Sequence, residues 1–191
     1  MGLGGLGLSA LLSASLSAAE PWHLNRAWLA ESDFLVSQPP LFAALLLTDA
    51  EATVLANWAA PQEPVLAPVT DSIAIGQPLA VMFVLGGCVA DSQGHCDVRG
   101  RLLLTRPDDS VYVAPPPFAI WQGPAPASPE AVQLGQGTLR LTFASDDPLG
   151  EYHLAAELWD ANGSAKLVLR RDFQLTAAAV QPTEPVASQA E

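Results

Sequence analysis

The sequence has few positively charged residues, and those it has are scattered. Eight of its 191 residues are lysine or arginine, against twenty aspartates and glutamates, which gives a formal net charge of -12. Binding to nucleic acid or to an anionic membrane surface depends on clustered cations. The chain contains one lysine, Lys166, and one adjacent basic pair, Arg170–Arg171. We therefore expect no nucleic-acid partner and no binding to an anionic membrane surface.

Beyond its first nineteen residues, the chain lacks an apolar run that could span a bilayer, which takes about 20 residues in a helix. Residues 1–19 carry no charge and consist mainly of Gly, Leu, Ser and Ala, with Ser17 and Ala19 at the positions that signal peptidase prefers. The usual positively charged start is missing. We predict a signal peptide over 1–19 and a periplasmic or secreted protein with no membrane span after leader removal. An uncleaved anchor and an unrelated leader are the alternatives.

Cysteine and histidine are also scarce, and both cysteines lie in the stretch GGCVADSQGHCDVRG, residues 86–100. A structural zinc site takes about four ligands, usually from close Cys or His pairs, and no second pair accompanies Cys88 and Cys96. The C-x-x-C spacing of redox proteins is absent as well. Two cysteines in an exported chain, one at the end of a strand and one just before the next, predict a Cys88–Cys96 disulfide. We expect no metal and no cofactor.

Recognisable catalytic patterns are missing. The chain has no G-x-S-x-G motif, and its three histidines lie in unrelated contexts. His153 alternates outward on an expected strand, which predicts a surface residue. The pairs Asp108–Asp109 and Asp146–Asp147 are typical of turns, and Asp160 with Asn162 predicts a hairpin turn because the distal glutamate of a calcium loop is missing. We predict no catalytic residues and a protein that is not an enzyme.

What the sequence does contain, from residue 63 to 176, is a series of short strands separated by turn signals. LAVMFVLG (79–86) is apolar at every position, which predicts a central strand covered on both faces. TLRLTF (138–143) alternates cleanly, and Asn162–Gly163 predicts a hairpin. Without helix patterns between them, these strands predict an all-β fold, an immunoglobulin-like antiparallel sandwich. The low-complexity tail, 177–191, is predicted to be disordered.

The segment before the strands, residues 20–62, is predicted to be an N-terminal appendage with a short helix. Thr48 and Glu51 have the spacing of a capping box, so the helix is expected from Asp49 to about Ala59. Residues 41–47 form a short apolar run, which is either a buried strand or an earlier helical turn. Periodicity does not decide between the two.

Two stretches resemble known domains. DDPLGEYHLAAELWD resembles the penultimate strand of many immunoglobulin-like domains, where a D-x-x-G-x-Y turn leads into a tyrosine corner. The resemblance implies that Asp147, Gly150 and Tyr152 take these positions and that the Tyr152 hydroxyl bonds to the backbone. RLLLTRPDDSVY is similar to macroglobulin-like and other bacterial Ig-like modules. Residues 65–176 as a whole resemble small exported bacterial proteins of this kind, which implies a fold but no activity.

Two tryptophans are the remaining clue to function. Trp159 is expected on the outward face of its strand, and Trp121 lies in a proline-rich stretch, so both need cover. Either the 34–60 segment packs across the sandwich, or the two side chains form a partner-binding surface.

The function predicted from these patterns is a non-enzymatic interaction or structural module at the cell envelope, with a protein partner. The first alternative is an envelope assembly factor, a pilus-like subunit or a chaperone that donates or accepts a strand. The second is an enzyme of unrecognised type.

Overall fold

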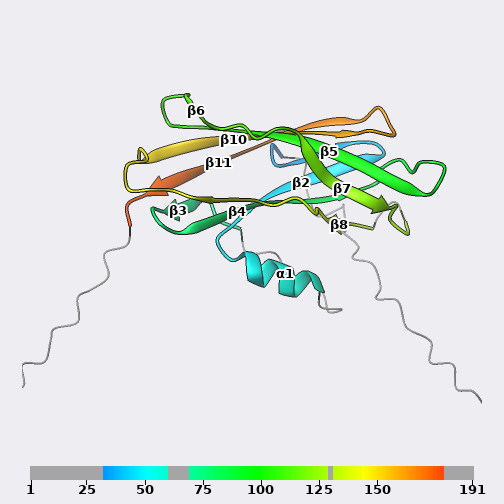
Figure 1. Ribbon diagram of the computed structural model, residues 1–191, viewed down its shortest axis with the longest axis horizontal. Helices are drawn as coiled ribbons and strands as arrows, with labels where there is room; N and C mark the ends of the chain where they lie inside the picture. Colours follow the sequence, from blue (N-terminus) through cyan, green and yellow to red (C-terminus); the bar gives the residue numbers. More distant parts are fainter. Residues whose placement is uncertain (1–31, 60–68, 129–130, 179–191) are drawn as a thin grey trace, which may run out of the picture.

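The computed structural model describes residues 32–59, 69–128 and 131–178, which form two β-sheets packed face to face and one helix (Figure 1). The predicted leader and nearly all of the predicted disordered tail lie outside the described residues. The elements are β1 Leu35–Gln38, β2 Leu41–Thr48, α1 Glu51–Ala59, β3 Ser72–Ala74, β4 Pro78–Gly86, β5 His95–Thr105, β6 Val111–Val113, β7 Phe118–Pro124, β8 Gln133–Leu134, β9 Leu139–Thr142, β10 Gly150–Asp160 and β11 Lys166–Thr176.

The five-stranded sheet has the order β1-β2-β4-β8, with β9 also paired to β4, and the six-stranded sheet has the order β3-β11-β10-β5-β6, with β7 also paired to β5. All pairs are antiparallel except β3 with β11. The predicted all-β sandwich with one short helix is confirmed. The predicted hairpin is confirmed too, since β10 and β11 pair from Gly150↔Leu175 to Trp159↔Lys166.

Strand β4 contains the continuous apolar run 79–86 and is buried on both faces. It lies between β2 on one side and β8 and β9 on the other, and its inward side chains Val81, Phe83 and Leu85 are buried against the six-stranded sheet. Its opposite face is covered by α1, whose Val54 packs with Ala80 and Met82. The predicted cover on both faces is therefore confirmed, and Figure 1 shows α1 outside the five-stranded sheet.

The apolar run that the sequence left undecided is strand β2. It pairs with β4 along its length, from Phe42↔Gly86 to Thr48↔Ala80, and places Leu41, Leu45 and Leu47 in the core with no exposed surface. The sandwich therefore begins upstream of the boundary predicted at residue 63. The predicted appendage supplies an inner strand, because a buried apolar strand needs a neighbouring strand to pair with its backbone N–H and C=O groups.

Helix α1 begins close to the predicted position, but the capping box does not form. Thr48 Oγ1 accepts a hydrogen bond from the N–H of Ala50 at 3.0 Å, as a cap should. The Glu51 carboxylate instead accepts two hydrogen bonds from the Arg140 guanidinium of β9, at 2.6 and 2.7 Å. A cross-element ion pair has replaced the local contact, and it fixes the first turn of the helix over the sheet.

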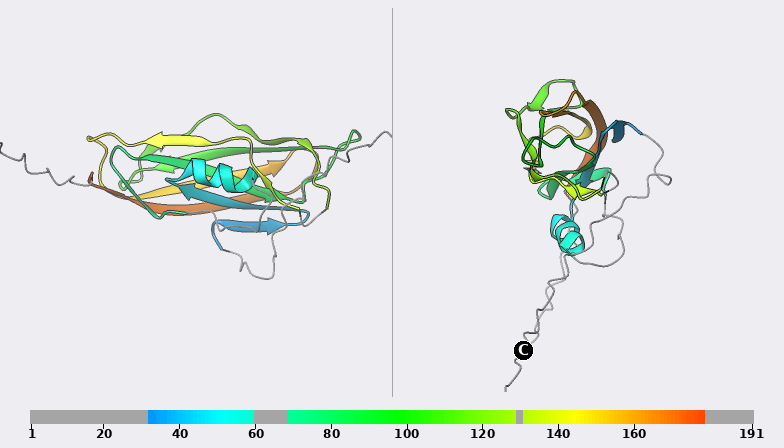
Figure 2. Two further views of the ribbon diagram at one scale, coloured as in Figure 1. Left: turned by 90° about the horizontal axis from the view of Figure 1, so that it is seen from below. Right: turned by 90° about the vertical axis from the view of Figure 1, so that its right-hand side faces the viewer.

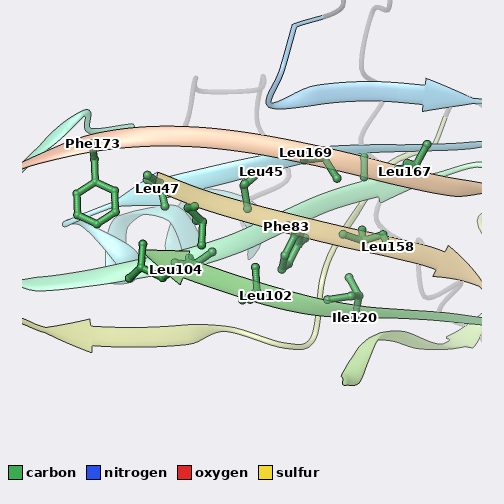
Figure 3. Close-up of a cluster of buried hydrophobic side chains, with 14 of the residues drawn as sticks. Leu45, Leu47, Phe83, Leu102, Leu104, Ile120, Leu158, Leu167, Leu169 and Phe173 are labelled. Atoms are coloured by element: carbon green, nitrogen blue, oxygen red, sulfur yellow. The ribbon is translucent and has the colours of Figure 1, made fainter. Parts of the chain in front are cut away.

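The interior is one apolar cluster drawn from both sheets (Figure 3). Phe83 of β4 lies among leucines of β2, β5 and β11, and the core side chains are between 0% and 3% exposed. The end-on view in Figure 2 shows the two sheets curving toward each other at their sides. On one side the chain itself joins them, because the N–H of Gly135 donates to Phe83 O and that of Gln136 donates to Ile120 O of β7, both at 2.7 Å.

Candidate functional site

The disulfide loop joins β4 to β5. Cys88 and Cys96 form the predicted bridge, with their Cα atoms 5.9 Å apart. Inside the loop, the Asp91 carboxylate accepts hydrogen bonds from the N–H groups of His95 and Gln93, which lower the pKa of Asp91. Gly94 supplies the positive φ of the tight turn. In the chain-entropy description, closing nine residues contributes about 2.5 kcal/mol. All of these contacts are internal, so the loop is a structural element.

Asp160 links the disulfide loop to the β10–β11 hairpin. Its side chain is buried, and it accepts hydrogen bonds from the N–H of Val89 at 2.6 Å and from the N–H of Asn162 at 3.0 Å. The Asn162 amide in turn donates to the backbone oxygens of Val89 and His95. The sequence predicted only a turn here. The alternation that places Leu158 inward also places Asp160 inward, and this signal could have identified the buried carboxylate.

The tyrosine-corner residues lie at the opposite end of β10. The Tyr152 hydroxyl donates to the carbonyl oxygen of Pro148 at 3.1 Å, and Gly150 has a φ of 134°. Asp147 Oδ2 accepts from the N–H of Ala144 at 2.7 Å and from the Tyr112 hydroxyl at 3.1 Å. These hydroxyls and the carboxylate fix the turn before β10, so this group also holds the fold together.

Burial and Asp147 raise the pKa of Tyr112 to about 12, and burial raises that of Tyr152 as well. Because the chain has only two tyrosines, absorbance at 295 nm reports these two hydroxyls alone. We expect little phenolate at pH 10, where a free tyrosine is half ionised. The folded pKa of Tyr112 lies above the unfolded value, so its contribution to stability is complete below pH 10 and is lost as the pH rises toward 12. In the Asp147→Asn variant, Tyr112 should ionise at lower pH. A tyrosine titration midpoint near pH 10 in the native chain would contradict the buried contact between Tyr112 and Asp147.

The two tryptophans do not share a surface. Trp121 packs against the core cluster from β7, and its Nε1 donates to the Pro124 carbonyl oxygen at 3.2 Å. Trp159 alternates with the buried Leu158 and Asp160, so it lies on the outer side of β10, as the sequence predicted. The 34–60 segment does not cover it, because α1 packs on the other sheet (Figure 2). Only Trp159 remains as a candidate for partner binding.

Trp159 belongs to a surface that we name the open face, the outward side chains of β5, β10 and β11 at one end of the six-stranded sheet. The strand registers align Arg99, Trp159 and Lys166 in one row, Arg101, Glu157 and Val168 in the next, and Leu103, Ala155 and Arg170 in the third. Asp97 completes the surface beside Arg99. Within the described residues, no helix or strand packs over these rows, and Leu103 and Val168 are 41% and 46% exposed (Figure 1).

The open face is positively charged, whereas the protein as a whole is acidic. Four of the eight basic residues of the chain lie there, Arg99, Arg101, Lys166 and Arg170. Arg99 pairs with Asp97 at 2.9 Å and lowers the pKa of that carboxyl, and Arg101 pairs with Glu157 at 2.5 Å. Four cations and two anions leave this surface at about +2, in a chain of net charge -12. Exposed pairs of this kind add little stability, but they hold the guanidinium groups in place.

In the next row of the same sheet, His153 has acidic neighbours. Its Nδ1 lies 3.0 Å from Asp172 Oδ1, and this hydrogen bond raises the pKa of the imidazole. Glu151 is two residues away on the same face of β10. We name Glu151, His153 and Asp172 the acidic corner. The sequence predicted His153 as a surface residue, but the register of the hairpin, in which 153 faces 172, could have identified the pair.

In the described part of the chain, the His153–Asp172 pair has no hydroxyl nucleophile beside it in the same row of strands, so it does not indicate a hydrolytic site. The nearest hydroxyl in the same row of strands is that of Thr105, and it donates to the His153 carbonyl oxygen at 3.5 Å instead of facing the imidazole. A nucleophile must contact its general base. Among the described residues, this row therefore lacks the geometry of a hydrolase triad.

No family model and no curated protein matches the chain. A family 123 glycoside hydrolase from Clostridium perfringens is 8% identical with a TM-score of 0.42, over 71% of this chain and only 27% of the hydrolase. A CARDB domain from Pyrococcus furiosus is 10% identical with a TM-score of 0.38, over 78% and 100% of the two chains. A Niemann-Pick type C2 protein from the Japanese carpenter ant is 9% identical with a TM-score of 0.39, over 69% and 89%. The functional argument therefore rests on the residues of this chain.

Proposed function

We propose that this protein is an exported, non-enzymatic interaction module that binds an acidic protein partner at the cell envelope through the open face. The observation that carries the proposal is the concentration of half the chain's basic residues around Trp159 on an uncovered sheet. Tryptophan and arginine are the side chains most enriched at the energetic centres of protein interfaces. A net positive surface favours an acidic partner, and it disfavours the pairing of two open faces with each other.

The disulfide supports the location of this function. Bridges of this kind persist in the periplasm and outside the cell, where thiols are not kept reduced. No helix in the described ranges is long and apolar enough to cross a membrane. Together with the predicted signal peptide, the bridge favours a periplasmic or secreted module.

The alternative of an assembly factor that exchanges a strand has less support, because the part of the β11 edge that does not pair with β3 is already occupied. The N–H of Arg170 donates to Asp33 O at 2.6 Å, and that of Lys166 donates to Gln38 Oε1 at 3.0 Å. Arg171 lies on the inward side of this edge strand with its guanidinium over the Phe34 ring, and burial lowers its pKa. Inward charges on edge strands discourage pairing with another chain.

Site-specific photo-crosslinking in the native host tests the proposed surface. A photoreactive residue at position 168, on the open face, should crosslink to an acidic partner. The same residue at position 149 should not, because Leu149 is similarly exposed but lies on the turn before β10. Raising the salt concentration should weaken the complex, since exposed charges are screened.

The Trp159→Ala and Arg170→Gln variants should reduce the crosslink at position 168, whereas Arg140→Gln, which removes the same charge from the other sheet, should leave it unchanged. Equal crosslinking at positions 168 and 149, or a crosslink that both open-face variants leave intact, would show that the partner binds elsewhere.

A further inference from the structure

The acidic corner brings together three potential metal ligands from two neighbouring strands. Glu151 and His153 lie two residues apart on β10 and therefore point to the same side, and Asp172 lies directly opposite His153 on β11. One oxygen or nitrogen atom of each residue lies within 4.8 Å of those of the other two. We propose that Glu151, His153 and Asp172 bind one zinc-class divalent ion on the outer surface of the six-stranded sheet.

The distances fit a single ion with small side-chain movements. Two ligands of a tetrahedral ion with bonds of about 2.0–2.1 Å lie about 3.4 Å apart. The His153 Nδ1 to Asp172 Oδ1 distance is 3.0 Å, so these two atoms need to move apart by only about 0.4 Å to bind one metal. Glu151 is exposed and free to rotate by the remaining distance. The ion takes the place of the proton that Nδ1 and Oδ1 share without metal.

The donor set selects the ion. One imidazole and two carboxylates suit Zn²⁺ and its neighbours in the first transition row, whereas Ca²⁺ and Mg²⁺ prefer oxygen ligands alone. Three protein ligands leave at least one coordination position to water. The Cys88–Cys96 pair is already bonded and does not compete for the ion.

Charge at this end of the sheet favours a cation. The carboxylates of Glu151 and Asp172 face His153 on its own strand and on β11, and Asp109 on the turn between β5 and β6 adds a third negative charge that acts on the same imidazole. The interaction of a divalent ion with these charges is attractive from all three sides. The open face begins in the next row of the same strands, where Arg170 lies two residues from Asp172 on the same side of β11, and it binds by separate residues.

Isothermal titration of the untagged chain with zinc chloride tests the site. We expect one ion bound per chain, a rise in melting temperature that EDTA reverses, and proton release on binding. In NMR spectra, the ring signals of His153 should shift or broaden on addition of zinc. His153→Ala and Asp172→Asn should each abolish saturable binding while keeping the same cooperative unfolding transition.

The matched control is His95→Ala, which removes an exposed histidine from the disulfide loop, and it should bind zinc as the native chain does. Zinc binding that survives both His153→Ala and Asp172→Asn would overturn the proposal, as would weak uptake of several ions per chain without saturation. Failure of the zinc site leaves the partner-binding test at position 168 unaffected, because the two groups share no residue.

Discussion

A chain that lacks residues 32–59 should not fold. These residues form β1, β2 and α1, and β2 is the inner neighbour of β4 in the five-stranded sheet. Without β2, the edge of β4 loses its hydrogen-bond partners from residue 80 to 86, and the core loses Leu41, Leu45 and Leu47. Each buried leucine contributes about 1.5–3 kcal/mol on area alone, so the total approaches the whole stability of a domain. We expect no cooperative denaturant transition and strong binding of an apolar dye.

A pair of point variants checks the same conclusion in a chain that still folds. Leu45 on β2 has no exposed surface, and Leu45→Ala should cost about 2–5 kcal/mol. Leu55 on α1 is 44% exposed, and Leu55→Ala should cost less than about 0.5 kcal/mol. Equal denaturation midpoints for the two variants, or a cooperative transition in the chain that lacks residues 32–59, would contradict this conclusion. The N-terminal strands would then pack on a sandwich that is stable without them.

Local patterns were enough to predict most of the strands. The alternation in β9 and β10, the asparagine-glycine turn before β11 and the apolar run of β4 each depend on neighbours in sequence, and each has the expected structure. The disulfide was predictable for the same reason, since both cysteines lie on one connection. The features that local patterns did not decide, or predicted wrongly, depend on which strands become neighbours in space.

Three features that the sequence left open or predicted wrongly have this common cause. A seven-residue apolar run has the same composition as a strand or as a helical turn, and only the free edge of β4 decides that residues 41–47 form a strand. Glu51 had a local acceptor role available, but in the folded chain its carboxylate pairs with Arg140 of β9 at 2.6 Å. Trp121 was grouped with Trp159 because both needed cover; both are half-buried, but only Trp121 packs against the core cluster.

The open face and the acidic corner differ in how far each could be predicted from the sequence. Trp159 was placed on the outer face from alternation, but its basic neighbours come from β5 and β11 and required the strand order. The acidic corner required only the hairpin register, because a turn at residues 160–165 pairs 159 with 166 and therefore 153 with 172. Extending the register of a hairpin that the sequence identifies is thus a direct route to cross-strand sites.

Replacing Asp160 with alanine should cost about 3 kcal/mol and loosen the disulfide loop. The Asp160 carboxylate is only 3% exposed, so water does not take over its role when the side chain is removed. Two backbone donors in part-buried positions, the N–H groups of Val89 and Asn162, would be left without this acceptor. Hydrogen bonds to charged groups contribute about 1.5–3 kcal/mol each, and a buried donor left unpaired carries its desolvation cost.

Asp91 provides the matched comparison, because it also accepts two backbone hydrogen bonds in the same loop but is exposed to solvent. Asp91→Ala should therefore cost much less than Asp160→Ala, since water replaces the lost acceptor. Asp160→Asn keeps one acceptor oxygen and should fall between the two. The rate at which dithiothreitol reduces Cys88–Cys96 gives a second measurement, and it should rise most in Asp160→Ala, because Asp160 ties Val89, next to the bridge, to the hairpin. Equal losses of stability in Asp91→Ala and Asp160→Ala would show that burial of the carboxylate is not what makes this contact strong.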